Sequence, residues 1–257
     1  MDSRRTKQLI YGGIFVIVVC LIVYGAYALF LKPAPSCFDH VQDGGETGVD
    51  CGGPCAKVCT PSTLQGITAV GGVQSFVTSL GHYTFLAQIA NANTDFGARS
   101  VGYSIDLYGG ASSTLIASIP GQSFIYGGEV KYLLVPNLLV STPFTNASLT
   151  IMNANIAWIT SSTMGGVPQF VVQNLGPGPL SSSTVSVNGE LTDNDASAFS
   201  NILIVGVFKD VNGNVIGASQ TELDGIAPNQ TETFSVSYPV TPDIDPSLTE
   251  LYAYALR

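Results

Sequence analysis

The chain has 257 residues, a formal net charge of −9 and only 11% charged side chains against 46% hydrophobic ones. A chain so poor in lysine and arginine has no basic stripe to neutralise phosphates, which argues against nucleic acid as a partner. Beyond an apolar N-terminal segment, roughly 225 residues remain, a length that suits two domains of about 100 residues better than one.

Residues 10–31 form the first predicted element, an apolar run of 22 residues without a charged side chain. A helix needs roughly 20 apolar residues to cross the ~30 Å hydrocarbon core of a membrane. Arg4, Arg5 and Lys7 precede the run and a single lysine follows it, a bias that places the N-terminus in the cytoplasm. Residues 1–9 are therefore predicted to be a cytoplasmic tail, and the segment a single-pass signal anchor in the cell membrane with the bulk of the chain outside the cell.

A cleaved secretory signal is the alternative for this segment, since it also combines basic residues with an apolar stretch. The run is longer than the apolar core of such a signal, and no small-x-small cleavage pattern stands near its end. The anchor is therefore preferred. No second run of 18 apolar residues follows, so one crossing is expected.

Residues 32–60 form a predicted cysteine-rich collar. Four of the five cysteines fall within 23 residues here, and none follows. An even number of cysteines on the outer side of a membrane, in a segment too short to build a core, predicts two disulfides. The three possible pairings remain open. Zinc held by four thiolates is the alternative, which needs a reducing compartment and usually more closely spaced ligand pairs. The cysteines concerned are Cys37, Cys51, Cys55 and Cys59.

Carboxylates recur every three or four residues among the glycines of the collar, at Asp39, Asp43, Glu46 and Asp50. Their oxygens could converge on calcium, although the spacing matches no EF-hand loop. The alternative is that they are solvated loop acids, with the glycines supplying turns of positive φ. Calcium is the one cofactor considered, and no catalytic or cofactor-binding residue is predicted.

The string GETGVDCGGPC at residues 45–55 resembles a cysteine-rich element of membrane-anchored surface proteins from bacteria of the candidate phyla radiation. The resemblance implies a membrane-proximal extracellular module ahead of immunoglobulin-like repeats. It implies no defined activity.

Residues 61–163 and 164–257 are predicted to be two tandem antiparallel β-sandwiches, which makes the chain mainly β. Short apolar alternations broken by Gly, Pro, Asn and Asp are typical of successive strands and turns. Residues 202–208 are more uniformly apolar, which fits a strand central to a sandwich. Asn212-Gly213 predicts a hairpin with a type I′ turn, and residues 161–166 are interpreted as a linker.

The two predicted modules repeat one another at an offset of about 101 residues, with low identity but the same order of elements. For example, residues 106–108 correspond to 207–209, and residues 127–130 to 228–231. This order resembles FxLYD-type and related immunoglobulin-like or fibronectin-like bacterial surface modules. The resemblance implies a seven-strand or similar sandwich with no catalytic residues.

The sequence offers little that would support catalysis. The only histidines are His40 in the collar and His82 in the first module, and no nucleophile-elbow pattern accompanies them. Trp158 is expected to pack in the first module or at its junction with the second. The acid pairs are expected to form turns; they are Asp193 with Asp195 and Asp243 with Asp245. The chain is therefore predicted not to be an enzyme.

Three functions remain open for such a chain. The preferred one is a membrane-tethered structural or interaction protein that attaches to a protein or glycan, or organises the envelope. The second is an accessory subunit of a secretion or pilus-like assembly that docks through strand edges, with possible homo-oligomers. The third is a ligand-binding receptor or cell-wall enzyme, which would need a pocket with convergent polar groups.

Overall fold

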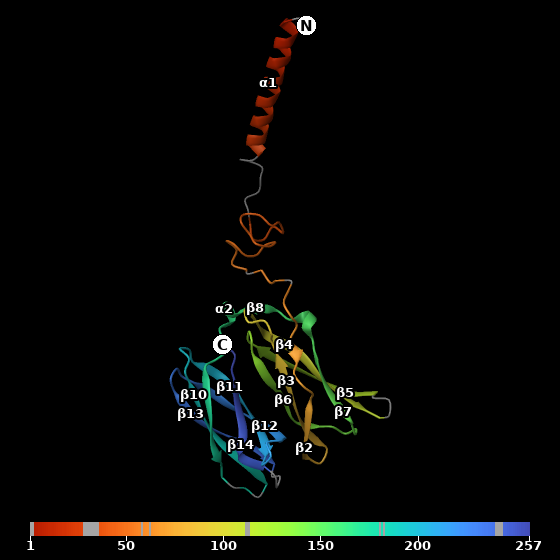
Figure 1. Ribbon diagram of the computed structural model, residues 1–257, viewed down its shortest axis with the longest axis vertical. Coiled ribbons are helices and arrows are strands. Elements are labelled where there is room, and N and C mark those ends of the chain that lie inside the picture. The colour runs from red at the N-terminus through yellow and green to blue at the C-terminus, as the bar shows by residue number, and fades with distance from the viewer. Residues whose placement is uncertain are drawn as a thin grey trace. The chain divides into compact units, whose positions relative to one another are not determined.

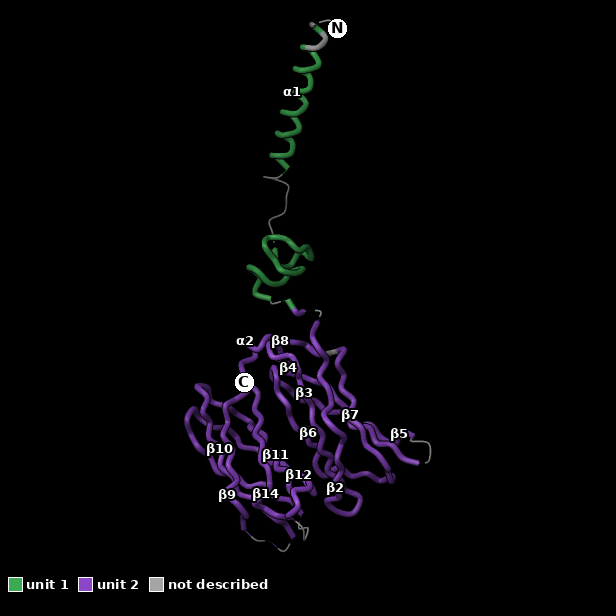
Figure 2. Tube along the Cα trace, in the orientation of Figure 1, with its two compact units in different colours: residues 1–59 green, residues 60–257 purple. Residues whose placement is uncertain are grey.

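A computed structural model of the protein describes residues 3–27, 36–57, 59–61, 63–110, 114–179, 181, 183–239 and 244–257. The chain divides into two compact units, residues 1–59 and residues 60–257, which Figure 2 colours separately. Within the described residues, the first unit holds one long helix and two disulfides. All the strands of the described part of the chain lie in the second unit, and the chain is mainly β, as predicted.

Helix α1 (Ser3–Ala26) contains most of the predicted membrane segment. Residues Lys7–Ala26 have a mean hydropathy of 2.5 and are long and apolar enough to cross a membrane. The sequence has no proline before residue 33, so nothing interrupts the backbone hydrogen bonds of the helix. Residues 28–31 of the predicted anchor lie outside the described residues. By length and composition the helix suits either a single-pass anchor or a signal sequence.

The first sandwich of the second unit consists of two antiparallel sheets (Figure 1). In one sheet, β3 (His82–Ala90) pairs with β6 (Val130–Leu139) on one edge and with β1 (Thr68–Ala69) and β2 (Gln74–Ser79) on the other. In the second sheet, β4 (Phe96–Gly109) pairs with β5 (Thr114–Ile125) on one edge and with β7 (Asn146–Ile151) and β8 (Trp158–Thr160) on the other. A 3₁₀ turn, Asn153–Asn155, precedes β8. Side chains of both sheets meet in one buried core.

The second sandwich has the same arrangement. One sheet has the order β13 (Thr231–Pro239), β10 (Thr184–Asp193), β9 (Phe170–Pro177). The other has the order β12 (Val215–Ile226), β11 (Phe199–Asp210), β14 (Ile244–Tyr254). Within the described residues each sandwich therefore has six strand positions, one fewer than the seven named first by the resemblance. In the first sandwich, β1 with β2, and β7 with β8, each occupy one position.

Strand β13 shows why these residues form a half-buried sheet. Phe234, Val236 and Tyr238 are buried in the second core, while the hydroxyl residues between them are exposed. This alternation matches the period of two along a strand, which sends successive side chains to opposite faces. The apolar face is removed from water against the facing sheet, which is the main favourable contribution to folding.

The hairpin between β11 and β12 forms as predicted, but the prediction of a type I′ turn was wrong. The amide of Gly213 donates to the carbonyl of Asp210 (2.9 Å), which centres the turn on Val211 and Asn212. Gly213 has a φ of 83°, whereas Asn212 is not among the residues of positive φ. A type I′ turn needs positive φ at both central residues. The Asp210 carboxylate accepts the amide hydrogens of Asn212 (2.9 Å) and Asn214 (2.8 Å), and these bonds favour the longer loop.

Strand β11 is central to its sheet, as its apolar run predicted, and both of its faces are buried. Ile204 and Phe208 point into the second core, whereas Val205 and Val207 point to the opposite face. That opposite face packs against the outer face of the β2–β3–β6 sheet, where Leu86 is 3% exposed. The two sandwiches are therefore joined sheet to sheet in one compact unit.

The segment interpreted as a linker forms part of this packing. Residues Ser161–Met164 form the short helix α2, and Met164 is buried. The sulfur of Met164 lies against Gly97 of β4, where a Cβ atom would come within 2.6 Å of it. The connection between the sandwiches is thus ordered against the first sandwich.

Candidate functional site

The collar contains the two disulfides that its cysteine content predicted. Cys37 pairs with Cys55 and Cys51 with Cys59, with Cα–Cα distances of 5.7 and 5.0 Å. Both distances lie in the usual range for a disulfide. The bonds span 18 and 8 residues of sequence, so they restrict the unfolded chain of a segment that has almost no apolar core.

The glycines of the 45–55 string fit closely around the disulfides. A Cβ atom at Gly48 would lie 2.8 Å from the sulfur of Cys59 and 2.9 Å from that of Cys51. Gly53 has a φ of 58°, and a Cβ atom there would come within 2.1 Å of the Gly45 carbonyl oxygen. Side chains at these positions would displace the sulfurs or the backbone. The string therefore encodes a disulfide-linked turn structure.

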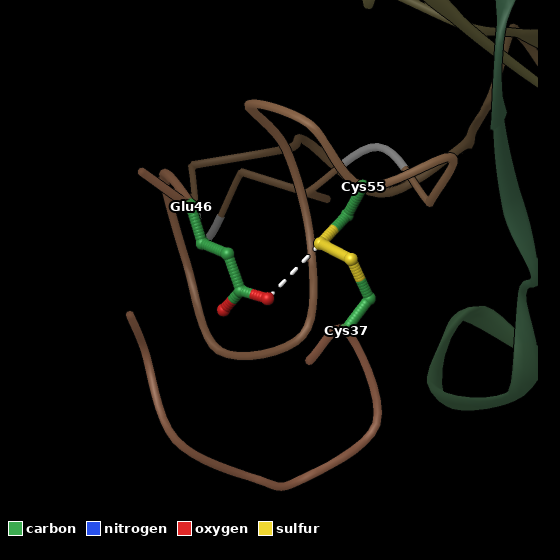
Figure 3. Close-up of side chains that lie close together, drawn as sticks. All are labelled: Cys37, Glu46 and Cys55. Carbon is green, nitrogen blue, oxygen red and sulfur yellow. Dashed lines mark hydrogen bonds between the residues drawn. A yellow bond between two sulfur atoms is a disulfide. The ribbon is translucent and has the colours of Figure 1, made fainter. Parts of the chain in front are cut away.

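Glu46 lies beside the Cys37–Cys55 disulfide (Figure 3). One carboxylate oxygen is 3.0 Å from the Cys55 sulfur, and the other accepts the amide hydrogen of Asp50 at 3.0 Å. A disulfide sulfur carries no proton, so the first contact is a conventional hydrogen bond only in the reduced form. Metal binding by these cysteines likewise needs thiolates. The zinc alternative therefore applies only to a reduced collar.

The four acids predicted to bind calcium are placed within the collar but not gathered at one point. The Asp39 carboxylate accepts the Val41 amide hydrogen at 2.9 Å. The buried Asp50 carboxylate accepts the His40 amide hydrogen at 3.0 and 3.1 Å, and the His40 Nδ1 atom lies 2.9 Å from it. Among the described residues, one group of at least three metal-ligating side chains has its ligand atoms within 4.8 Å of one another. This group consists of Cys37, Glu46 and Cys55. One oxygen of Asp43 is buried without a partner, and calcium binding stays a prediction.

The residues considered for catalysis each make local contacts or are exposed. The His82 Nδ1 atom is 3.2 Å from the Leu80 carbonyl oxygen, and the His40 side chain is 91% exposed. Trp158 packs against the core of the first sandwich, as expected. The Asp245 carboxylate accepts the amide and hydroxyl hydrogens of Ser247 (2.9 and 2.6 Å), as a turn-forming acid does. Asp243 lies outside the described residues.

A buried charged pair at the contact between the sandwiches was missed by sequence reasoning. Lys131 is 2% exposed and Glu129 is 9% exposed. The ammonium nitrogen of Lys131 lies 3.1 Å from the centre of the Phe124 ring and 4.9 Å from that of Tyr254 in the second sandwich, a cation–π arrangement. The one signal in the sequence was a lysine inside the otherwise apolar strand VKYLLV.

Burial changes the titration of this pair. Desolvation lowers the pKa of Lys131 to about 8, although the negative charge of Glu129 opposes the shift. Desolvation raises the pKa of Glu129, against the amide hydrogen bond from Tyr126 (2.8 Å) and the charge of Lys131. In the contact between the sandwiches, burial therefore disfavours the charged form of Lys131.

Because the pKa of Lys131 is lowered in the folded chain, the free energy of unfolding is expected to depend on pH. Between about pH 8 and 10.5 the unfolded chain holds more protons at Lys131 than the folded chain, so the free energy of unfolding is expected to rise with pH. The slope at this lysine approaches about 1.4 kcal/mol per pH unit. Denaturant unfolding between pH 7.5 and 9.5 measures it. Lys131→Met should abolish the slope in that window, and an equal slope in both proteins would contradict the assignment.

Polar contacts at the C-terminal end of the chain also join the sandwiches. The Tyr132 amide donates to the Tyr254 hydroxyl (3.1 Å), and the Tyr126 hydroxyl donates to the Ala255 carbonyl (3.0 Å). Arg99 donates to the carbonyl of Arg257 at 2.7 Å, and the Arg257 guanidinium pairs with Asp195. That guanidinium holds the pKa of Asp195 below its usual value. Strand β14 and the residues after it are therefore bound to both sandwiches.

These features define a class of protein: an apolar N-terminal helix, a disulfide-linked collar and two packed antiparallel sandwiches. No protein-family model matches the chain, and no curated protein matches its sequence. Among solved structures it has a likeness to a crystal structure of red sea bream transglutaminase, with 10% identity and a TM-score of 0.24. The match covers 73% of this chain and 32% of that one. A likeness at this score carries no argument about activity.

Proposed function

We propose that the protein is a single-pass membrane protein of the cell surface that presents a rigid pair of sandwiches to a protein or glycan partner. The observation that carries the proposal is the pair of disulfides, Cys37–Cys55 and Cys51–Cys59, which follows the apolar helix in sequence. Disulfides persist in oxidising compartments, which supports a collar on the non-cytoplasmic side. The basic residues before the helix support a cytoplasmic N-terminus.

The proposal assigns the sandwiches a binding role rather than a catalytic one. Within the described residues, no hydroxyl or thiol side chain hydrogen-bonds to the imidazole of His40 or His82. We further propose that the two sandwiches are copies of one module. Their sheets share one strand order, and β5 and β12 begin 101 residues apart, as do β6 and β13.

Thiol labelling of the full chain in intact cells tests the topology. Cys20→Ser first removes the thiol within the helix. A membrane-impermeant reductant, followed by an impermeant maleimide–polyethylene glycol, is then expected to add four labels, and none without reductant. Before labelling, the chain is expected to have its full mass of 26.8 kDa. It is also expected to stay in the membrane pellet after carbonate extraction.

Three results would contradict this topology. Labelling only after lysis would place the collar inside the cell. A shorter chain in the supernatant would identify the apolar helix as a cleaved signal. Free thiols that react only after a chelator is added would support the metal alternative over the disulfides.

A further inference from the structure

The first sandwich has a surface almost without charge. Residues 60–163 contain five charged side chains, Asp95, Arg99, Asp106, Glu129 and Lys131. Three of these, Asp106, Glu129 and Lys131, are buried. Of the two exposed ones, Asp95 directly precedes β4 and Arg99 is the fourth residue of this strand. The rest of this surface lacks the charges that usually keep a soluble domain from associating.

The end of this sandwich opposite Asp95 and Arg99 is formed by three turns. Because the strands are antiparallel, the β2–β3 turn, the β4–β5 hairpin and the β6–β7 loop reach the same end. Val140 donates to the Gly81 carbonyl and Thr145 donates to the Tyr108 carbonyl, both at 2.8 Å, and these bonds tie the β6–β7 loop to the other two turns. We call this region, residues 77–81, 107–110, 114–119 and 138–145, the uncharged end.

Large apolar side chains are exposed at the uncharged end. Leu80 is 98% exposed, Val77 63%, Leu139 62% and Leu115 53%. Beside them lies a groove of about 230 Å³, whose lining includes Leu107, Ile116, Ile119, Leu138 and Leu139. Gly81, next to Leu80, lies against the lining residue Leu139, where a Cβ atom would be 3.5 Å from it. A projecting leucine and an apolar groove therefore occupy neighbouring positions on one surface, which is typical of interaction sites.

We propose that the uncharged end binds the uncharged end of a second copy of this chain. The second sandwich carries ten acidic and two basic residues, so two copies that approach through it repel each other. At the uncharged end no such repulsion arises, and depletion of charge is characteristic of the core of a protein interface.

The neighbouring leucine and groove also suit a twofold arrangement. In such a contact the same patch serves on both copies, so Leu80 of each copy fills the groove of the other. The inference rests on the proposed function in one respect: a membrane anchor holds copies in one plane and raises their effective concentration.

The oligomeric state of the full chain in detergent micelles, measured by sedimentation at a series of protein concentrations, tests the proposal. The wild type is expected to form a dimer whose dissociation constant changes little with salt, because no charges meet. Leu80→Asp and Leu139→Asp are each expected to raise the dissociation constant at least 100-fold. The matched control is Leu175→Asp in β9 of the second sandwich, which should leave the dimer intact. Leu175 is 54% exposed, close to the 62% of Leu139.

The proposal would be overturned if the wild type were monomeric. It would also be overturned if Leu80→Asp did not weaken the dimer, because the contact would then lie elsewhere, such as in the apolar helix. These outcomes are separate from those of the proposed function. A chain released by carbonate extraction that still dimerises through Leu80 would contradict the membrane anchor and support the contact.

Discussion

Asn91→Asp is expected to lower the free energy of unfolding by about 3 kcal/mol. Asn91 is 2% exposed, and its amide nitrogen donates to the carbonyls of Phe96 (2.7 Å) and Tyr126 (2.9 Å). Its side-chain oxygen accepts the amide hydrogen of Asn93 at 3.0 Å. A carboxylate has no hydrogen to donate, so the variant would bury a charge against two carbonyl oxygens. Denaturant unfolding of the full chain in detergent, followed by circular dichroism, measures the loss.

The second sandwich supplies the matched reverse exchange, because Asp193 occupies the position of Asn91. The backbone amide of Asp193 donates to the Gln230 carbonyl (3.0 Å), and the backbone amide of Asn91 donates to the Glu129 carbonyl in the same way (2.9 Å). One carboxylate oxygen accepts the Asp195 amide hydrogen at 2.9 Å, while the other is buried without a partner. Asp193→Asn is therefore expected to raise the free energy of unfolding by about 1 kcal/mol. Destabilisation by both exchanges would contradict the equivalence of the two positions.

Val205→Asp is expected to separate the two sandwiches without unfolding them. Val205 is fully buried, but it faces the contact between the sandwiches and not the core of its own. A carboxylate placed there without a partner costs about 3–5 kcal/mol, enough to disrupt the contact. Each sandwich keeps its own core. Thermal unfolding should then show two transitions, and protease should cut within residues 161–169.

Ile204→Asp is the matched control for this separation. Ile204 is the preceding residue of the same strand, equally buried, but it points into the second core. Its replacement is expected to unfold the second sandwich outright, with loss of its circular dichroism signal. If the two variants behave alike, the sandwiches do not fold independently of their contact.

Several elements could be predicted from the sequence because each depends on local pattern. Residues 10–31 are apolar throughout, and a backbone in lipid has to satisfy its own hydrogen bonds, which favours a helix. The alternation in β13 determined which face of that strand is buried. The even number of cysteines in the collar predicted two disulfides.

Other features could not be predicted because they depend on how distant segments meet. Three disulfide pairings agree with the cysteine spacing, and only the path of the collar brings Cys37 to Cys55. The apolar run of β11 indicated burial of both faces, but it did not show that the second face is covered by the other sandwich. Likewise the type I′ turn predicted for Asn212-Gly213 did not form, because the Asp210 carboxylate holds the amides of a longer loop.

The sequence by itself determined the apolar helix, the disulfide-linked collar and two β-rich modules. Only the tertiary structure decided that these modules pack sheet to sheet, that Lys131 is buried in their contact and that one carboxylate oxygen of Asp193 is buried without a partner. The reason is that the pattern of apolar residues along a strand shows which side chains are buried, because each buried position by itself favours an apolar residue. Which groups then lie opposite one another is set by the contacts of strands far apart in the chain.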